Sequence, residues 1–440
     1  MLRLFKQIGA AALVGLLALA RPALAQTTYD CTTYSAGTTV TVTGTHTTIT
    51  INNQCNGVNF IFQDVTATFL QADDATCNFS PGTSVTFRRA NFFQNSGSAS
   101  LAQMNFCGSQ IIVEDSSFSG VVLAFRLRDS GGTTVVSVRN SYFLYNDVVA
   151  ANIYGIIGNL AFTTVTEVRR IEVLNNTFVA GVTGCECLCT NVLMASDGPF
   201  TFSNVGDVVL EGNVYTCLNT YSAAPTSNNL AVAVLIYHPV SYTRSIVVRD
   251  SVMTLSGYEF AIGVGFGTGA TSVEQLKIAN VTVTATAATT KAGGFTTPTW
   301  SNGGSIEITN FYVTSTCSGA SNAHGNCYGV QIEQQLLDTA SLTIRDSTFT
   351  VSAPNGATNV KAVQIGGANS AVTGGIANVS LVRIRDSTFT VTATVGAIGI
   401  QLGDETESNT LEYLEVIGTT VRVTATNTVA TCFWQPGTTV

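Results

Sequence analysis

Apolar residues recur at fixed positions in twelve repeats along this chain. When the repeats are aligned on one polar position, which we call the corner residue, an apolar residue lies four positions before it, two positions before it and three positions after it. The pattern is clearest where Ile344–Val351 and Ile384–Val391 have the same sequence, IRDSTFTV. Recurrence at intervals of 25 to 40 residues indicates a repeat architecture. The corner residues are Asp64, Arg89, Asp115, Asn140, Asn175, Gly212, Asp250, Asn280, Asn310, Asp346, Asp386 and Gly418.

The spacing around the corner residue predicts a bend in the backbone. Apolar residues at alternate positions before the corner are typical of a strand with one buried face. The apolar residue three positions after the corner has the opposite parity, so in a straight strand it would face solvent. Eleven of the twelve corner residues are Asp, Asn or Gly, which tolerate a left-handed backbone. We therefore expect a one-residue corner between two strands that both face the interior.

A third strand is expected in many repeats after these two. Each repeat would then form one coil of three short strands, and stacked coils would form a β-solenoid. The candidates for the third strand are Val122–Leu127, Asn152–Ile157, Ala231–Ile236, Ala261–Phe266, Val330–Ile332, Val363–Ile365 and Ile398–Leu402.

Residues 1–25 have the pattern of a secretory signal peptide. Arg3 and Lys6 precede an apolar run, Ile8–Ala20, and Ala23–Ala25 forms a small-x-small cleavage site. The alternative, a membrane anchor, is disfavoured because the apolar run is short and Arg21 and Pro22 interrupt it. No later segment offers the ~20 uncharged apolar residues that a spanning helix needs. We expect a secreted or extracellular-surface protein without a transmembrane segment after signal removal.

The repeats also divide the rest of the chain. Residues 26–58 are rich in Thr and are expected to cap the first coil, because an open end exposes sheet edges. Residues 59–425 contain the twelve repeats, and residues 426–440 are expected to form a C-terminal cap or tail.

The charge of the chain excludes some partners. The formal net charge is −8, and residues 1–25 carry Arg3, Lys6 and Arg21 but no acid, so the mature chain has −8 − 3 = −11. An acidic chain with only four Lys lacks the basic stripe of a nucleic-acid-binding protein. It also lacks the charge to dock on an anionic membrane.

Eleven cysteines favour disulfide bonds in a secreted chain. Cys31 with Cys55 and Cys317 with Cys327 are plausible pairs. The Cys185–Cys189 segment, CECLC, could hold a metal, but zinc sites usually space their cysteines by two or more residues and need a fourth ligand. Disulfides from this segment to Cys217 or elsewhere are the favoured interpretation. An odd number of cysteines leaves at least one thiol free or paired between molecules.

The three-strand coil, the Asp/Asn corner and the inward Phe series resemble the pectin-lyase-like architecture over residues 59–425. This resemblance implies an all-β fold, a right-handed parallel β-helix (β-solenoid) of about twelve coils with three short strands per coil. The segments IRDSTFTV, VLNNTFV and VVRDSVMTL are similar to the dispersed-gene-family surface proteins of trypanosomatid protozoa and their kinetoplastid relatives. That similarity implies a glycosylated, cysteine-containing surface protein.

Catalytic motifs of enzymes with this architecture are not recognisable in the sequence. Polygalacturonase-like hydrolases use clustered Asp with a Gly-His-Gly and an Arg-x-Lys, whereas here Asp73-Asp74 stands without a partner motif. The three histidines, His46, His238 and His324, lie far apart. A lyase site could be formed by Arg88-Arg89, Arg126 and Arg128-Asp129. A surface charge ladder is the better interpretation, because Arg and Glu alternate at the outward position before the corners: Arg88, Glu114, Arg139, Glu211, Arg249, Arg345 and Arg385.

These observations favour a non-enzymatic secreted or cell-surface protein that presents loops for adhesion or recognition of glycans or cell-surface proteins. The alternative is a carbohydrate-active enzyme, a polysaccharide lyase or glycoside hydrolase, which the fold alone suggests. No catalytic residue, cofactor or metal site is predicted. Four sequons for N-glycosylation occur, at Asn78, Asn175, Asn280 and Asn378.

Overall fold

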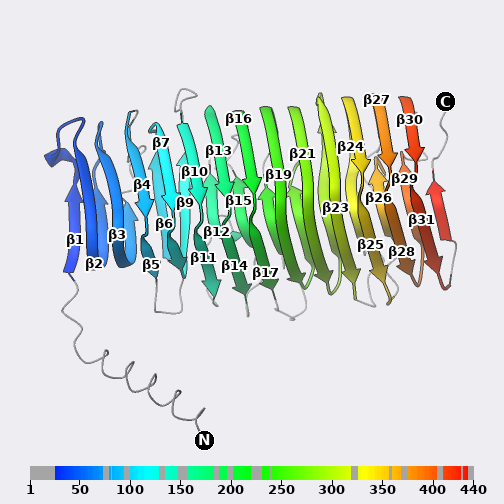
Figure 1. Ribbon diagram of the computed structural model, residues 1–440, viewed down its shortest axis with the longest axis horizontal. Helices are drawn as coiled ribbons and strands as arrows, with labels where there is room; N and C mark the ends of the chain where they lie inside the picture. The colour runs from blue at the N-terminus through cyan, green and yellow to red at the C-terminus, as the bar shows by residue number, and fades with distance from the viewer. Residues whose placement is uncertain are drawn as a thin grey trace, which may run out of the picture.

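The chain folds into strands that stack along one axis. Figure 1 shows the computed structural model, an elongated molecule with its first strands (blue) at one end, its last strands (red) at the other and the strands side by side. The described strands form one sheet of 32 strands joined by parallel pairings. The structure describes residues 25–72, 79–80, 82–93, 100–127, 134–146, 156–163, 165–182, 188–195, 202–219, 230–237, 239–318, 326–355, 359–367, 375–403, 410–427 and 430–434.

Parallel pairing joins equivalent strands of successive repeats into three rows, which we call ladders. The first ladder contains the strands before each corner: β3 (Asn59–Ala72), β4 (Ser84–Arg88), β7 (Gln110–Glu114), β10 (Thr134–Arg139), β13 (Val168–Leu174), β16 (Phe202–Glu211), β19 (Val240–Gly257), β21 (Ala270–Ala287), β23 (Ser305–Cys317), β24 (Asn326–Arg345), β27 (Gly375–Arg385) and β30 (Leu411–Ile417). The second contains the strands after it: the later parts of β3, β19, β21 and β23, and β5 (Asn91–Phe93), β8 (Ser117–Ser119), β11 (Tyr142–Asn146), β14 (Thr177–Val182), β17 (Val214–Asn219), β25 (Thr348–Ala353), β28 (Thr388–Ala393) and β31 (Thr420–Ala425).

The third ladder contains the strands that follow the second in each repeat. Its members are β6 (Ser100–Phe106), β9 (Val121–Leu127), β12 (Ile156–Thr163), β15 (Leu188–Ala195), β18 (Leu230–Ile236), β20 (Phe260–Phe266), β22 (Lys291–Ser301), the first part of β24, β26 (Asn359–Ile365), β29 (Ala397–Leu402) and β32 (Ala430–Trp434). Most of the predicted third strands are therefore confirmed. Of the strand expected at Asn152–Ile157, residues 152–155 lie outside the described residues, and β12, described from Ile156, aligns Leu160 with Leu123 of β9.

The predicted corner is confirmed in all twelve repeats. Every corner residue has a positive φ, between 48° at Asp386 and 66° at Gly212, including the atypical Arg89 at 50°. Ile384 and Phe389 on either side of one corner are both fully buried. One expectation needs correction, since several strands are long. β19 and β21, for example, run through the corner because parallel hydrogen bonding continues on both sides of it.

Substitutions at a corner test this backbone conformation. We expect Asn310→Val to lower the free energy of unfolding by about 1–2 kcal/mol, because a β-branched residue is strained at a φ of 49°. Asn310→Gly is expected to change it by only a few tenths of a kcal/mol, since Gly adopts this φ freely. Urea unfolding of both variants measures the difference, and equal stability of the two would contradict a left-handed corner.

A second left-handed position recurs eight residues before the corner, and it was not predicted. It is found in seven successive repeats, at Glu167, Asn204, Tyr242, Ser272, Asn302, Asp338 and Asn378, with φ between 45° and 57°. The residue types vary, so composition alone gives little signal here. Each of these repeats therefore has two tight bends at a fixed separation.

The interior contains one continuous row of apolar side chains, in which aromatic rings stack from repeat to repeat. The ring centroids of Phe118 and Phe143 are 5.1 Å apart, and those of Phe143 and Phe178 are 4.8 Å apart. Tyr215 continues the row after Phe178 at 5.3 Å. These distances match the separation of neighbouring strands, about 4.8 Å, as expected for rings in register. The inward Phe series predicted from the sequence is part of the core.

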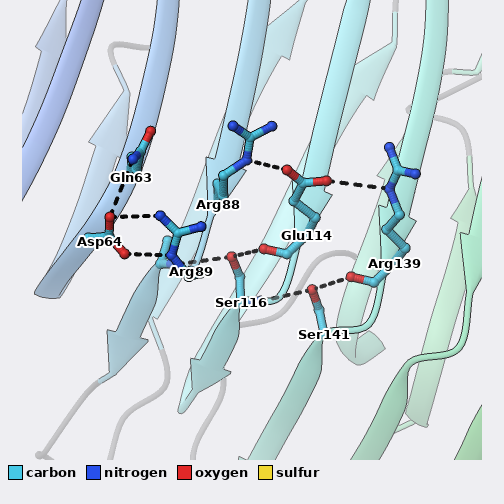
Figure 2. A network of polar contacts seen from close by, with 9 residues as sticks. Gln63, Asp64, Arg88, Arg89, Glu114, Ser116, Arg139 and Ser141 are labelled. Atoms are coloured by element: carbon cyan, nitrogen blue, oxygen red, sulfur yellow. Dashed lines mark hydrogen bonds and ion pairs between the residues drawn. The ribbon is translucent and has the colours of Figure 1, made fainter.

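Polar side chains directly after the corner form a buried ladder of their own (Figure 2). The backbone N–H of Ser116 donates to Oγ of Ser141 at 3.1 Å, and the N–H of Ser141 donates to Oδ1 of Asn176 at 2.9 Å. The N–H of Asn176 in turn donates to Oδ1 of Asn213 at 2.9 Å. These side chains satisfy backbone groups that the bend at the corner removes from the regular strand pairing.

The disulfide pairs predicted at Cys31–Cys55 and Cys317–Cys327 are confirmed. Cys189 pairs with Cys217, as favoured from the sequence, whereas Cys185 and Cys187 lie outside the described residues. Cys432 in β32 is a free, exposed thiol. Disulfides of this kind are compatible with an extracellular or secreted protein.

The segment expected to cap the first coil contains β1 (Ala25–Asp30), a 3₁₀ turn (Cys31–Thr33) and β2 (Thr39–Asn52). β1 pairs in parallel with β2, and β2 pairs in parallel with β3, so both strands continue the sheet. At the other end, β32 pairs with β29. The last repeat leaves Leu414 and Val416 partly exposed, although they occupy inward positions of the pattern.

Candidate functional site

The charged residues before the corners form ion pairs between neighbouring repeats, as predicted (Figure 2). Arg88 donates to Glu114, whose other carboxylate oxygen lies 3.5 Å from Nε of Arg139. Further along the first ladder, Arg249 lies 2.6 Å from Glu211, Arg345 lies 3.5 Å from Glu307, and Arg385 pairs with Glu415. The arginine side chains are about half exposed, so each pair contributes little to stability.

The other residues considered for catalysis do not form a common site within the described part of the chain. Asp73, Asp74, Arg128, Asp129, His238 and His324 lie outside it, as does the side chain of Arg126. Nε2 of His46 donates to the carbonyl oxygen of Thr43 at 2.9 Å, and Nδ1 of His46 accepts from Thr27 at 2.8 Å. His46 thus joins β1 to β2 as a structural residue. The Arg89 guanidinium donates twice to Asp64, which lowers the pKa of that carboxyl.

Three of the four sequons lie at exposed left-handed bends. Asn175 and Asn280 are corner residues, and Asn378 occupies the second bend. Nδ2 of Asn280 donates to Asp250 at 2.7 Å, and Nδ2 of Asn378 donates to Asp338 at 2.9 Å. A glycosylated amide keeps one N–H, so it can still make such a bond. Asn78 lies outside the described residues.

We expect N-glycans on Asn175, Asn280 and Asn378 when the chain is secreted from a eukaryotic cell, because all three side chains face solvent. Enzymatic deglycosylation converts an occupied Asn to Asp, and peptide mass spectrometry then reports each position. Unmodified Asn at all three positions would contradict this prediction.

The third ladder carries a hollow of about 200 Å³ on one side of β18, β20 and β22. Its apolar lining includes Leu230, Val232, Phe260 and Ile262. By the alternation of side chains along a strand, Val232 and Ile262 lie opposite Ala231 and Ala261, which face the core. A hollow with apolar walls on the outer face of a sheet is an unusual feature for a surface that only meets water.

An ion pair lies against the hollow and spans the width of the third ladder. Nζ of Lys291 lies 3.0 Å from both carboxylate oxygens of Glu333. Lys291 begins β22 and aligns with Asn326 of β24, whereas Glu333 follows Ile332, further along β24. Both side chains are about 15% exposed, so this pair is far more buried than the ion pairs of the first ladder.

A second lysine lies one strand further on, in β26. Lys361 is only 9% exposed and forms no hydrogen bond to any residue that the structure describes. Burial lowers the pKa of Lys361 to about 8, although the negative charge of Glu333 acts in the opposite direction and raises it. Tyr328 of β24 aligns with Lys361 in the neighbouring strand, on the outer face of the third ladder. Burial raises the pKa of the Tyr328 hydroxyl. Two lysines and one glutamate therefore meet in a partly dehydrated region.

Uncharged polar side chains form the next outward column of the third ladder. Nε2 of Gln331 donates to Oε1 of Gln364 at 2.9 Å, and Gln401 follows in register with Gln364. Oγ1 of Thr296, which lines the hollow, donates to Oε1 of Gln331 at 3.4 Å. We call the hollow together with Lys291, Glu333, Lys361 and this column the outer groove, which is apolar toward β18 and polar toward β29.

The sequence analysis did not predict the outer groove. Two signals for it exist: a lysine within the largely apolar strand VKAVQI, and a glutamine that recurs in GVQI, AVQI and GIQL. Period-two alternation separates inward from outward positions, but it does not reveal that an outward position is buried.

A second hollow, of about 420 Å³, follows the second bend of the repeats. It is lined by polar residues, among them Tyr242, Arg244 and Glu274. Arg244 is already bound to Asp207, with Nε 2.8 Å from Oδ1, and the Tyr242 side chain is largely exposed. Val205 is the one aliphatic side chain in the lining of this hollow, so it lacks an apolar wall like that of the first hollow.

Within the described residues, no group of three or more His, Cys, Asp or Glu side chains is arranged to hold a metal ion. No helix in the described part of the chain has the length and apolar character needed to cross a membrane. Comparisons of the chain with protein-family models, with curated proteins and with solved structures gave no match.

Proposed function

We propose that this chain is a right-handed parallel β-helix of about twelve coils, with three strands per coil. The three ladders, visited in the same order in each repeat, support this arrangement. The proposal includes the pectin-lyase-like architecture and a relationship to the surface proteins of trypanosomatid protozoa, on the sequence similarity given above.

We propose that the protein is secreted or displayed at the cell surface and recognises a ligand without chemical turnover. The observation that carries this proposal is the outer groove, a concave apolar site with convergent buried polar groups on the face of a rigid stack of strands. Of the arginines considered for a lyase site, Arg88 and Arg89 are engaged in ion pairs with Glu114 and Asp64, which favours recognition over catalysis.

Filling the hollow tests this function. A Cβ added to Gly265, which lines the hollow, would lie 3.5 Å or more from its nearest neighbours, so Gly265→Phe places a ring there without a backbone clash. Thr284→Phe adds the same ring at an exposed position of the second ladder and serves as the matched control. Fluorescently labelled wild-type protein and both variants are applied to arrays of immobilised glycans, lipids and peptides.

Retention of the wild-type protein and Thr284→Phe, with loss of retention in Gly265→Phe, is the expected result. Equal behaviour of all three proteins, including no retention of any, would overturn recognition through the groove. Incubation with pectin, alginate and chondroitin sulfate addresses the enzyme alternative. New reducing ends or unsaturated uronates there would place the protein among the carbohydrate-active enzymes instead.

A further inference from the structure

We propose that the outer groove binds a free amphipathic organic anion, a carboxylate attached to a short alkyl chain or an aromatic ring, with its apolar part in the hollow and its carboxylate beside Lys291 and Lys361. This inference rests on the proposed recognition function and specifies its ligand class. The argument comes from the charge, the burial and the shape of the groove.

The charges of the groove favour an anion. Lys291 and Glu333 form a close pair, while Lys361, a residue only 9% exposed, makes no hydrogen bond to any residue that the structure describes. A charged lysine whose side chain is largely removed from water and lacks a protein hydrogen bond is unfavourable in the free protein. A carboxylate would supply a hydrogen-bonded partner of opposite charge. Hydrogen bonds between two charged groups are stronger than those between neutral groups, especially in a site shielded from water.

The rest of the groove favours an apolar body on that anion. The wall toward β18 and β20 consists of Leu230, Val232, Phe260 and Ile262. The hollow, at about 200 Å³, exceeds the roughly 150 Å³ of an apolar protein cavity that accommodates benzene. Its volume therefore suits an aromatic ring or an alkyl chain of several carbons. Because Lys291 and Glu333 line the same hollow, the apolar and charged parts of one small molecule can be bound together.

The test is isothermal titration calorimetry of the full-length protein at pH 7 with four probes: octanoate, octan-1-ol, octylammonium and acetate. Octanoate is expected to bind at least about tenfold more tightly than octan-1-ol or octylammonium, since it alone offers both the chain and the negative charge. Acetate, which lacks the chain, is expected to bind at least about a hundredfold more weakly than octanoate.

Two variants separate the contributions within the groove. Lys361→Met is expected to weaken octanoate binding about tenfold or more and to leave octan-1-ol binding unchanged. Gly265→Phe is expected to abolish binding of both probes, and Thr284→Phe to change neither. Thermal unfolding and circular dichroism confirm that each variant is folded, and the comparison of the four probes on wild-type protein needs no variant.

Tighter binding of octan-1-ol or octylammonium than of octanoate would overturn the anion assignment. Octanoate binding that is unaffected by Gly265→Phe would place the anion elsewhere and overturn it equally. Either result leaves recognition through the groove open to the array experiment, which uses other ligands. If no probe binds to the wild-type protein, the assignment of this ligand class is wrong, whatever the arrays report.

Discussion

Phe349→Ala is expected to lower the free energy of unfolding by about 3–5 kcal/mol. The Phe349 ring is fully buried, stacks on Phe389 at 4.9 Å and meets Phe311 edge-on at 5.8 Å. It also lies against the backbone of Gly329 in β24, so it connects the second ladder to the third. Removing the ring leaves a cavity that strands pinned in register on both sides cannot close.

Urea unfolding followed by circular dichroism, with the disulfides intact, measures this effect. The matched control is Thr350→Ala, one residue further on, where the side chain is exposed and the expected change is within about 0.5 kcal/mol. Comparable losses in the two variants would mean that Phe349 does not face a closed interior.

Lys361→Met is expected to stabilise the protein at pH 7 by about 1–3 kcal/mol and to remove a pH dependence. Burial lowers the pKa of Lys361 from its usual 10.5 to about 8, so the charged form is destabilising in the folded state. Between pH 8 and about 10 the unfolded chain holds more protons at this position than the folded one. The stability of the wild-type protein should therefore rise with pH in this window, by up to about 3 kcal/mol in total.

Among the residues that the structure describes, the charged and titratable groups around Lys361 are Glu333 and Tyr328 on β24 and Lys291 on β22. Burial raises the pKa of Tyr328, which favours the opposite trend above pH 10, so the comparison stays below that value. The measurement is the unfolding free energy of both proteins at pH 7, 8, 9 and 10. The variant should be the more stable at pH 7, and the two should converge as pH rises. A variant that is less stable than wild type at every pH would contradict the destabilising role of the buried ammonium.

The strands before and after each corner could be predicted because two independent features of the sequence mark the corner: the type of the corner residue and the positions of the apolar residues on either side of it. At Asp386, for example, the residue type favours a left-handed backbone, and the apolar Ile384 and Phe389 require a change of direction between them. Even Arg89 could be placed at a corner, because the apolar residues around it fix the register. The charge ladder followed from the same register, which puts Arg88, Glu114 and Arg139 side by side.

The second bend and the outer groove could not be predicted in this way. The second bend accommodates residues as different as Glu167, Tyr242 and Ser272, so no composition identifies it. The groove depends on curvature of the third ladder, which lets Lys291 at the start of β22 reach Glu333 at the register shift between β22 and β24. Side-chain alternation contains no information about such curvature.

The most direct test of the parallel, inward-facing stack of repeats is a crystal structure of the purified protein. Electron density should reveal Ile344 beside Ile384 in neighbouring strands of the same direction, and the ring of Phe389 directly above that of Phe349 in an enclosed centre. Neighbouring repeats running in opposite directions, or an isoleucine and a phenylalanine of one repeat on opposite surfaces of the sheet, would contradict the account.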